Sequence, residues 1–379
     1  MSPCWTSSRW RNGTLSSTLP NVRRILLLIT DLEIGGTPTV VRELAVRLHQ
    51  PTEVCIDVAC LARRGPVADQ LEARGITVHA LDASGTKDLG LFNRFVKLLR
   101  SGQYDTVVSF LLHANLVAAA ASLRVRGVRF IQSIQTTQPN PRWHWQVQRF
   151  IHRAAGEIVV ASASVARCAE ERSHVPARKI VIIPNAIDPA EFAELAARDT
   201  FTSARPVRVG FIGRLDPVKR VPDLIRAIAI LGDAAHLHLY GAGAQRGQLE
   251  QLVRTSQLES RVTFHGAIPR PHDALMNMDV LVLPSEAEGF GLVLIEAMAA
   301  GVPVVATRAP GIRDVVRHGT TGLLVPIGSP EKLAEAIASA AEDSALRRKL
   351  IVLGKEHVHR RFTWERILPM YRKLLRLEP

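Results

Sequence analysis

Two glutamates stand out in the mostly apolar stretch of residues 281–305. Glu288 is followed by Gly289 and Gly291, and Glu296 lies eight residues further on. Glycines at the start of a helix leave the first N–H groups uncovered, so that these groups and the helix dipole can hold an anion. Carboxylates beside an anion repel it and are better explained as hydrogen-bond acceptors for neutral hydroxyls attached to it. A ligand that combines an anion with such hydroxyls is a sugar nucleotide.

The local pattern predicts a strand, a glycine turn, a helix and a second strand. The polar loop of residues 285–288 follows an apolar run, a helix is expected at 292–300, and Gly301 ends it. Two helical turns take about seven residues, so we expect Glu288 and Glu296 to project toward the same side. In the alternative interpretation, Glu288 caps the helix and Glu296 is an ordinary solvated residue.

Residues 285–307, SEAEGFGLVLIEAMAAGVPVVAT, resemble the donor-site signature of the retaining glycosyltransferases of family 4, group 1. The resemblance implies an α/β protein with the GT-B fold, in which two Rossmann-like doubly wound domains face each other across a cleft. It also implies that Glu288 contacts hydroxyls of the transferred sugar and that Glu296 holds the ribose. The backbone that would lie along the sugar and the diphosphate belongs to Gly289, Phe290, Gly291 and Leu292.

The length of 379 residues suits two domains better than one. Apolar residues make up 47% of the chain, and no run of 18 of them predicts a membrane-spanning helix. The four cysteines lack the spacing of zinc sites and disulfide scaffolds, so a reducing, cytoplasmic location is expected. The net charge of +13 fits nucleic acid, an anionic membrane or an Arg-rich composition, but no nucleic-acid-binding motif accompanies it.

The chain begins with residues rich in serine, threonine and arginine, and no acid occurs before Asp31. This segment lacks the apolar core and the small-residue cleavage site of a secretory signal. We therefore interpret residues 1–22 as a flexible tail, with a transit peptide as the alternative.

The first half of the chain opens with an apolar strand at residues 24–30, the pair Gly35 and Gly36, and a helix at 40–48. This order is typical of doubly wound α/β domains, in which glycines let a ligand approach the backbone. An ordinary tight turn is the alternative. Family 4 enzymes have a similar Gly-Gly loop that faces the donor phosphate, and the resemblance assigns both glycines to that role. Pro38 departs from the family pattern.

His113 follows a predicted strand at residues 106–111. Because ligands in such sheets bind at the carboxyl ends of strands, His113 is a candidate for the acceptor side of the cleft. A structural or surface role is the alternative, but the family has a His at a similar strand end near the transferred sugar. The other elements expected in this half are strands at 54–59, 76–81, 131–137, 158–161 and 180–183 and helices at 67–74 and 92–100.

Residues 140–153 contain two tryptophans, one phenylalanine and three arginines but no acid. A basic, aromatic helix of this kind suits an anionic membrane interface. In the alternative interpretation, Trp143, Phe150 and Ile151 pack on the domain and only the arginines are solvated.

Arg214 and Lys219 follow the first strand and glycine turn of a second predicted α/β domain, residues 207–361. Two such cations can hold a diphosphate from separate directions, although each alone could be a solvated surface charge. In family 4 the matching Arg and Lys bind the donor diphosphate. The preceding PNAID sequence is similar to the family's PNGVD turn and leads into a predicted linker at 189–206.

The string GAGAQRG at residues 241–247 is an incomplete dinucleotide fingerprint, because its third glycine comes one residue late. Glu259 lies near the distance of a ribose ligand, but it precedes the next strand instead of ending it. An NAD-dependent enzyme is therefore a poor alternative. The resemblance implies instead that this turn flanks the nucleotide pocket and that the base packs near Gly266, Ala267 and Ile268.

The final segment, residues 362–379, carries apolar residues at helical spacing, and Pro369 is expected to kink or divide the helix. In GT-B enzymes such a tail crosses back to the N-terminal, acceptor-side domain, which we place at residues 23–188. An ordinary capping helix is the alternative.

The expected catalytic set is His113, Arg214, Lys219 and Glu288, with no cofactor and no metal. No D-x-D sequence indicates a carboxylate-held cation, so Arg214, Lys219 and the helix N-terminus would stabilise the leaving diphosphate. The resembled family retains anomeric configuration with the leaving phosphate as the base, and no carboxylate here is an evident nucleophile.

These observations together predict a retaining, metal-independent hexosyltransferase. It would move a sugar from a UDP- or GDP-sugar to a glycan or lipid-linked acceptor in polysaccharide, lipopolysaccharide or glycolipid synthesis. We expect it in the cytoplasm or peripherally on the inner face of the membrane, without a nucleic-acid partner. A catalytically silent sugar-nucleotide-binding protein and an NAD-dependent enzyme are the alternatives.

Overall fold

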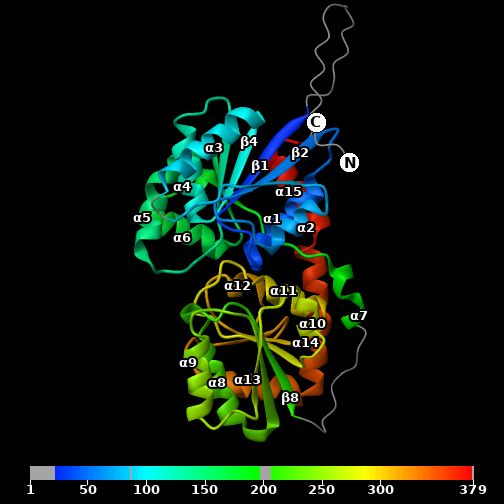
Figure 1. Cartoon of the computed structure of the whole chain (residues 1–379). Coiled ribbons are helices and arrows are strands. Elements are labelled where there is room, and N and C mark those ends of the chain that lie inside the picture. Colours follow the sequence, from blue (N-terminus) through cyan, green and yellow to red (C-terminus); the bar gives the residue numbers. More distant parts are fainter. Residues whose placement is uncertain (1–21, 86–87, 197–205, 378–379) are drawn as a thin grey trace, which may run out of the picture.

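The computed structural model describes residues 22–85, 88–196 and 206–377, which form two α/β domains placed one above the other in Figure 1. Parts of three predicted segments lie outside the described residues. They are residues 1–21 of the predicted tail, 197–205 of the predicted linker and 378–379 of the final segment.

The N-terminal domain is built on a seven-stranded sheet with the order β3-β2-β1-β4-β5-β6-β7. All neighbouring strands are parallel, and helices cover the sheet, so the strands are continuous apolar runs. The order reverses between β1 and β4, and the loops after these two strands meet at the same edge. The strands are β1 (Arg23–Ile29), β2 (Val54–Cys60), β3 (Thr77–Ala80), β4 (Thr106–Phe110), β5 (Arg129–Ile134), β6 (Glu157–Val160) and β7 (Ile180–Ile182).

The helices of this domain differ from the expected ones mainly at two points. Helix α1 begins at Gly36 and not at Val40, because Pro38 is tolerated in a first helical turn. Helix α6 was not predicted at all, since its sequence is polar and rich in small residues. The helices are α1 (Gly36–Leu48), α2 (Pro66–Glu72), α3 (Leu89–Gly102), α4 (Leu112–Ser122), α5 (Arg142–Ile151) and α6 (Ala163–Ser173).

The predicted strand at residues 131–137 is too long, because β5 ends at Ile134. Residues 135–137 leave the sheet and run to the C-terminal domain, where the Thr137 hydroxyl donates a hydrogen bond to the Glu288 carbonyl. The peptide groups that would have extended β5 therefore lie at the contact between the domains.

The C-terminal domain repeats this plan with a six-stranded parallel sheet in the order β10-β9-β8-β11-β12-β13. Its order reverses between β8 and β11, which brings the loops after these two strands together. The strands are β8 (Val207–Ile212), β9 (Ala235–Tyr240), β10 (Val262–Gly266), β11 (Val280–Leu283), β12 (Val304–Thr307) and β13 (Leu323–Val325).

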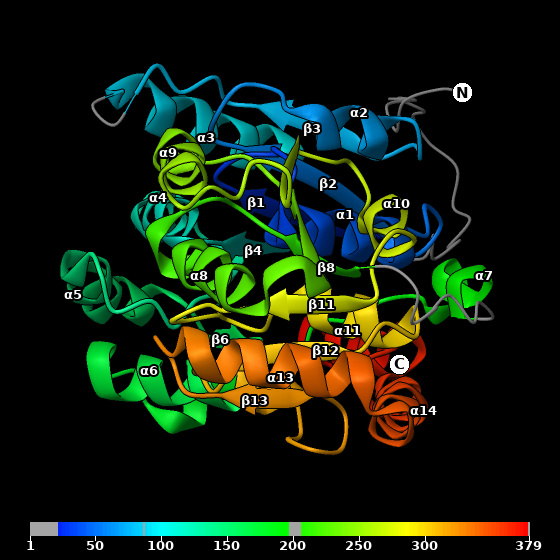
Figure 2. The same ribbon diagram turned by 90° about the horizontal axis from the view of Figure 1, so that it is seen from below.

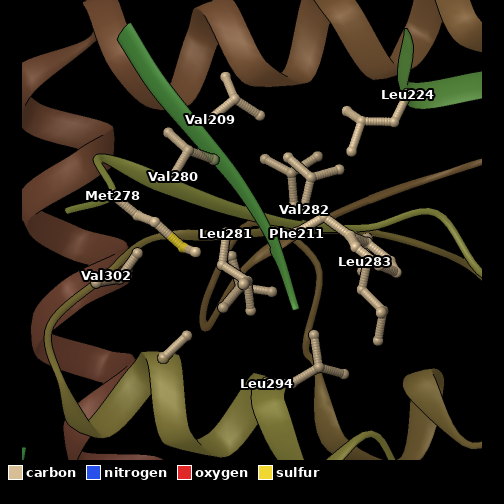
Figure 3. Close-up of a cluster of buried hydrophobic side chains, with 14 of the residues drawn as sticks. Val209, Phe211, Leu224, Met278, Val280, Leu281, Val282, Leu283, Leu294 and Val302 are labelled. Carbon is tan, nitrogen blue, oxygen red and sulfur yellow. The ribbon is translucent and has the colours of Figure 1, made fainter. Parts of the chain in front are cut away.

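Helices cover both faces of this sheet, and α8 and α13 pack side by side (Figure 2). Figure 3 shows the buried core, in which Val209 and Phe211 of β8 and the side chains of β11 pack above Leu294 of α11. The helices are α8 (Val221–Leu231), α9 (Arg246–Thr255), α10 (Pro271–Leu275), α11 (Leu292–Ala299), α12 (Ile312–Val315), α13 (Pro330–Glu342) and α14 (Ser344–Arg361).

The described part of the predicted linker is folded. A 3₁₀ helix, Pro189–Phe192, leads into α7 (Ala193–Ala196), and Phe192 and Leu195 are buried in the C-terminal core. Residues 189–196 are thus attached to that domain and do not form a free connection.

The last helix, α15 (Trp364–Leu375), packs on the N-terminal domain, where Trp364 and Tyr371 join the core around β1. It is continuous through Pro369, so the expected division of the helix does not occur. Before it, the Ile187 N–H donates to the Phe362 carbonyl at 2.9 Å, so the two chain segments that pass between the domains lie side by side.

Candidate active site

The loops after β8 and β11 bring two of the predicted site residues into contact. Lys219 ends a 3₁₀ helix after β8, and its Nζ donates to Oε1 of Glu288 at 2.6 Å. The two side chains are only 16% and 11% exposed, so this pair is shielded from solvent. The site thus holds a cation and a carboxylate in contact at the edge where ligands of such sheets bind.

Ser285 is a site residue that the sequence analysis did not single out. It is fully buried, and its hydroxyl donates to the same Oε1 of Glu288 at 2.6 Å. The Thr307 hydroxyl in turn donates to the Ser285 carbonyl. Two donors therefore fix the Glu288 carboxylate, and the only sequence signal was a serine two residues after a buried strand.

Glu288 lies in the loop before α11, and Glu296 lies within the helix. Helical spacing therefore does not relate the directions of the two side chains, and the expectation that they project toward the same side stays a prediction. Glu288 faces Lys219, whereas Glu296 is close to Glu191 and Arg42. The two carboxyl groups occupy different surroundings and can serve different parts of a ligand.

Glu296 is 8% exposed, and burial raises the pKa of its carboxyl to about 8. The nearby Glu191 adds to this rise and Arg42 opposes it. Because this pKa lies above the ordinary value, the carboxyl is mostly protonated at pH 7. Its ionisation costs free energy in the folded protein.

The Glu296→Gln variant is expected to gain stability relative to the wild type as pH rises. The folded-state pKa of about 8 exceeds the ordinary 4.5. The free energy of unfolding of the wild type therefore falls as pH rises through the range between these two pKa values, and it falls no further at higher pH. The difference in Tm between the two proteins should grow by a few degrees from pH 5 to pH 8.5, as measured by calorimetry. Glu335→Gln, at an exposed glutamate of α13, is the control. A difference that stays constant with pH would contradict the assignment.

Arg214 stands apart from the Lys219–Glu288 pair. Its guanidinium contacts Asp216 at 3.1 Å, and its side chain is 65% exposed. An exposed ion pair of this kind contributes little free energy, so little is lost when Arg214 leaves Asp216 for another anion.

The two glycines before α11 meet different structural requirements. Gly291 has φ 84°, a left-handed conformation that favours glycine, directly before the helix. A Cβ on Gly289 would lie 2.1 Å from the Gln135 carbonyl oxygen of the other domain. Phe290 is buried against Phe362, which leaves only its backbone for a ligand.

Gly35 and Gly36 open α1 without a conformational need for glycine. Gly35 has φ 178°, which any residue adopts, and Gly36 is already helical. A Cβ on Gly36 would meet open space, and one on Gly35 only an ordinary contact with Pro38. A strained tight turn therefore does not account for these two glycines.

His113 is exposed at the second position of α4, at the carboxyl end of β4. Its ring lies edge-on to Trp143 and His144 of α5, with centroids 6.3 and 6.1 Å apart. The three rings form an aromatic group where α4 and α5 begin.

Gly266 ends β10 with φ 79°, and its carbonyl accepts a hydrogen bond from the Gly241 N–H at 2.7 Å. Ala267 is exposed, while Ile268 packs against the C-terminal core. These residues lie beside the turn after β9, away from the Lys219–Glu288 pair in sequence but at the same sheet edge.

Helix α5 turns two of its aromatic residues outward. Trp143 is 48% and Phe150 64% exposed, so these two side chains do not pack fully on the domain, whereas Ile151 is only partly exposed. Trp145 is buried instead, and its indole N–H donates to the Gln138 carbonyl. No helix of the described residues is long and apolar enough to cross a membrane.

Two family models match the chain in sequence. The model of Glycosyltransferase Family 4 matches residues 34–191, and that of Glycosyl transferases group 1 matches residues 196–357. The two matches cover most of both domains. The chain belongs to the family 4 glycosyltransferases, and its two facing α/β domains have the GT-B fold, as the sequence predicted.

Among known relatives, N-acetyl-alpha-D-glucosaminyl L-malate synthase of Bacillus anthracis is 37% identical over 162 residues, or 42% of either chain. D-inositol 3-phosphate glycosyltransferase of Pseudarthrobacter chlorophenolicus is 28% identical over 356 residues, covering 83% of this chain and 84% of that protein. The match therefore spans less than half of the first relative. The crystal structure of Anabaena HepE with UDP-glucose has a TM-score of 0.84 at 24% identity and covers 93% of this chain and 99% of that one.

Proposed function

We propose that the protein is a glycosyltransferase that moves a sugar from a nucleotide-diphosphate sugar to a glycan or lipid-linked acceptor. The observation that carries this proposal is the shielded contact of Lys219 with Glu288 at the start of α11. It combines a cation for phosphate, an acceptor for sugar hydroxyls and the N–H groups of a helix start. Two further relatives, the lipopolysaccharide core biosynthesis glycosyltransferases LpsE and LpsD of Rhizobium meliloti, are 33% and 34% identical over 202 and 194 residues and support a role in cell-surface glycan synthesis.

In this proposal Arg214 and Lys219 hold the diphosphate and stabilise the charge that develops as the glycosidic bond lengthens. When Lys219 turns to the phosphate, the Glu288 carboxylate becomes available to the hydroxyls of the sugar, still held by Ser285. Glu296 takes the ribose. Gly35 and Gly36 face the phosphate from the other domain, where open space adjoins Gly36.

The remaining assignments concern the base, the acceptor and the stereochemistry. The base of a UDP or GDP donor packs near Gly266, Ala267 and Ile268, and His113 lies on the acceptor side. The reaction retains anomeric configuration and needs no metal, because the two cations and the helix N-terminus supply the positive charge. The leaving phosphate accepts the proton of the acceptor hydroxyl.

A panel of nucleotide sugars and acceptors tests the proposal directly. The purified protein is incubated with each donor, and release of free UDP or GDP and transfer to the acceptor are measured. We expect one donor to be turned over, with the configuration of the product read by NMR. A folded protein that binds a donor but never releases nucleotide would instead be a silent binding protein.

We also propose that the exposed side of α5 rests on an anionic membrane surface. Trp143 and Phe150 are exposed on this helix together with Arg142 and Arg149, Arg153 is exposed directly after it, and the segment contains no acid. Aromatic side chains favour the membrane interface, and the arginines attract anionic headgroups. A lipid-linked acceptor would then reach the N-terminal domain from the membrane.

Replacing Trp143 and Phe150 by alanine is expected to weaken binding to anionic vesicles by roughly tenfold, since two partly buried aromatic side chains contribute on the order of 1–2 kcal/mol. Cosedimentation with phosphatidylglycerol vesicles measures the effect. Val352→Ala, at an exposed apolar residue of α14, is the matched control. Unchanged cosedimentation of the double variant would remove α5 from the membrane contact.

A further inference from the structure

Three hydrogen bonds join the N-terminal domain to the segments around α11. The Thr137 hydroxyl donates to the Glu288 carbonyl at 2.6 Å, and the Ser162 hydroxyl donates to the Gly289 carbonyl at 2.8 Å. The Ser164 N–H donates to Oδ2 of Asp314 at 2.9 Å. In Figure 1, α11 and α12 lie on the side of the C-terminal domain that faces the N-terminal domain. We call these three contacts the interdomain clasp.

The donors of the clasp are themselves held in place. Thr137 is 1% exposed, and its carbonyl accepts from the guanidinium of Arg172, which lies over the ring of Trp145. Ser162 is 3% exposed, and its hydroxyl also accepts from the Val165 N–H at the start of α6. Because these side chains are buried and anchored, they present their hydroxyls in fixed directions.

Glu288 is therefore held from both domains at once. Ser285 and Lys219 of the C-terminal domain fix its carboxylate, while Thr137 of the N-terminal domain fixes its carbonyl. The carbonyl bonds orient the peptide groups of residues 288–289, and these lead directly into the start of α11. The N–H groups that would meet the diphosphate consequently depend on a contact with the other domain.

We propose that Thr137 and Ser162 are positioning residues, which align the backbone of Glu288 and Gly289 only when the two domains close. They do not touch the donor. They act through the carbonyls of the loop, so that the donor site is complete only in the closed arrangement. The expected effect on kcat rests on the proposed transfer reaction. The expected effect on the order of the backbone around Glu288 does not.

The first test compares Thr137→Val with Thr137→Ser. The valine variant keeps the shape but removes the hydroxyl, and we expect kcat to fall roughly five- to tenfold, the effect of one lost hydrogen bond. The Kd of the free nucleotide should change less than kcat, because most of the proposed contacts with the nucleotide come from the C-terminal domain. Thr137→Ser restores the donor and should recover kcat. Thr255→Val, whose hydroxyl bonds only within α9, is the matched control.

The second test does not need turnover. Hydrogen exchange of the amides of residues 288–292 should be faster in Thr137→Val and in Asp314→Ala than in the wild type and the Thr255→Val control, at unchanged Tm. Ser162→Ala should act in the same direction. A Thr137→Val protein with wild-type kcat and wild-type exchange would overturn the proposal. If the wild type turns over no donor, the proposed function fails. The hydrogen-exchange comparison alone then tests whether the clasp orders the loop around Glu288.

Discussion

Replacing Lys219 with alanine is expected to lower kcat by a factor on the order of 10²–10³, the effect of losing one charge-stabilising donor at a transition state. Two physical causes act together. The diphosphate loses a cation that already lies at the site, and the Glu288 carboxylate, 11% exposed, loses its charge partner. A shielded carboxylate without a cation is costly, so the loop around Glu288 should also lose order.

A double-mutant cycle with Glu288→Gln separates these causes. If the two residues act as a pair, the double variant should lose clearly less activity than the two single losses combined. Lys332→Ala, at an exposed ion pair of α13, controls for the loss of a lysine. Steady-state kinetics with the donor found in the panel give the values. A folded Lys219→Ala protein with kcat within twofold of the wild type would exclude Lys219 from the transfer step.

The family signature, together with the glycine turn before Arg214, was sufficient to assign Lys219 and Glu288 to one site. Their direct contact was not predictable, because it depends on the conformations of two loops at the sheet edge, in which the two residues are 69 positions apart in the sequence. The helix start at residue 292 was predicted correctly, so the eight residues from Glu288 to Glu296 cross the left-handed turn at Gly291 and are not a helical spacing.

The strands were largely predictable because parallel strands covered by helices are nearly unbroken apolar runs, as in β1 and β4. The contacts between the domains were not, since nothing in the local sequence of Thr137 or Ser162 indicates a partner more than a hundred residues away. The glycine at 289 illustrates the difference. From the sequence it made room for a ligand, whereas in the structure it makes room for the other domain.

Replacing Gly289 with alanine is expected to lower kcat/KM by at least about 10², because a displacement of roughly 1 Å at a reacting group is enough for such a loss. The new Cβ would lie 2.1 Å from the carbonyl oxygen of Gln135 and 2.6 Å from its carbonyl carbon. Both atoms belong to the main chain of the N-terminal domain, so rotation of a side chain cannot relieve the overlap. The conformation of Gly289 is not left-handed, so alanine fits the loop itself. Each domain should therefore fold, but the closed arrangement should be blocked.

Three measurements on Gly289→Ala together distinguish blocked closure from misfolding. The Kd of the free nucleotide and the Tm should stay near wild-type values, while small-angle X-ray scattering should show a larger radius of gyration. Gly156→Ala is the matched control, because a Cβ there meets open space directly before β6, at the amino end of the strand, and should leave activity unchanged. Full activity of Gly289→Ala would mean that catalysis does not require the contact with Gln135. Since the same contact accompanies the bonds from Thr137 and Ser162, that result would also count against a catalytic role for the clasp.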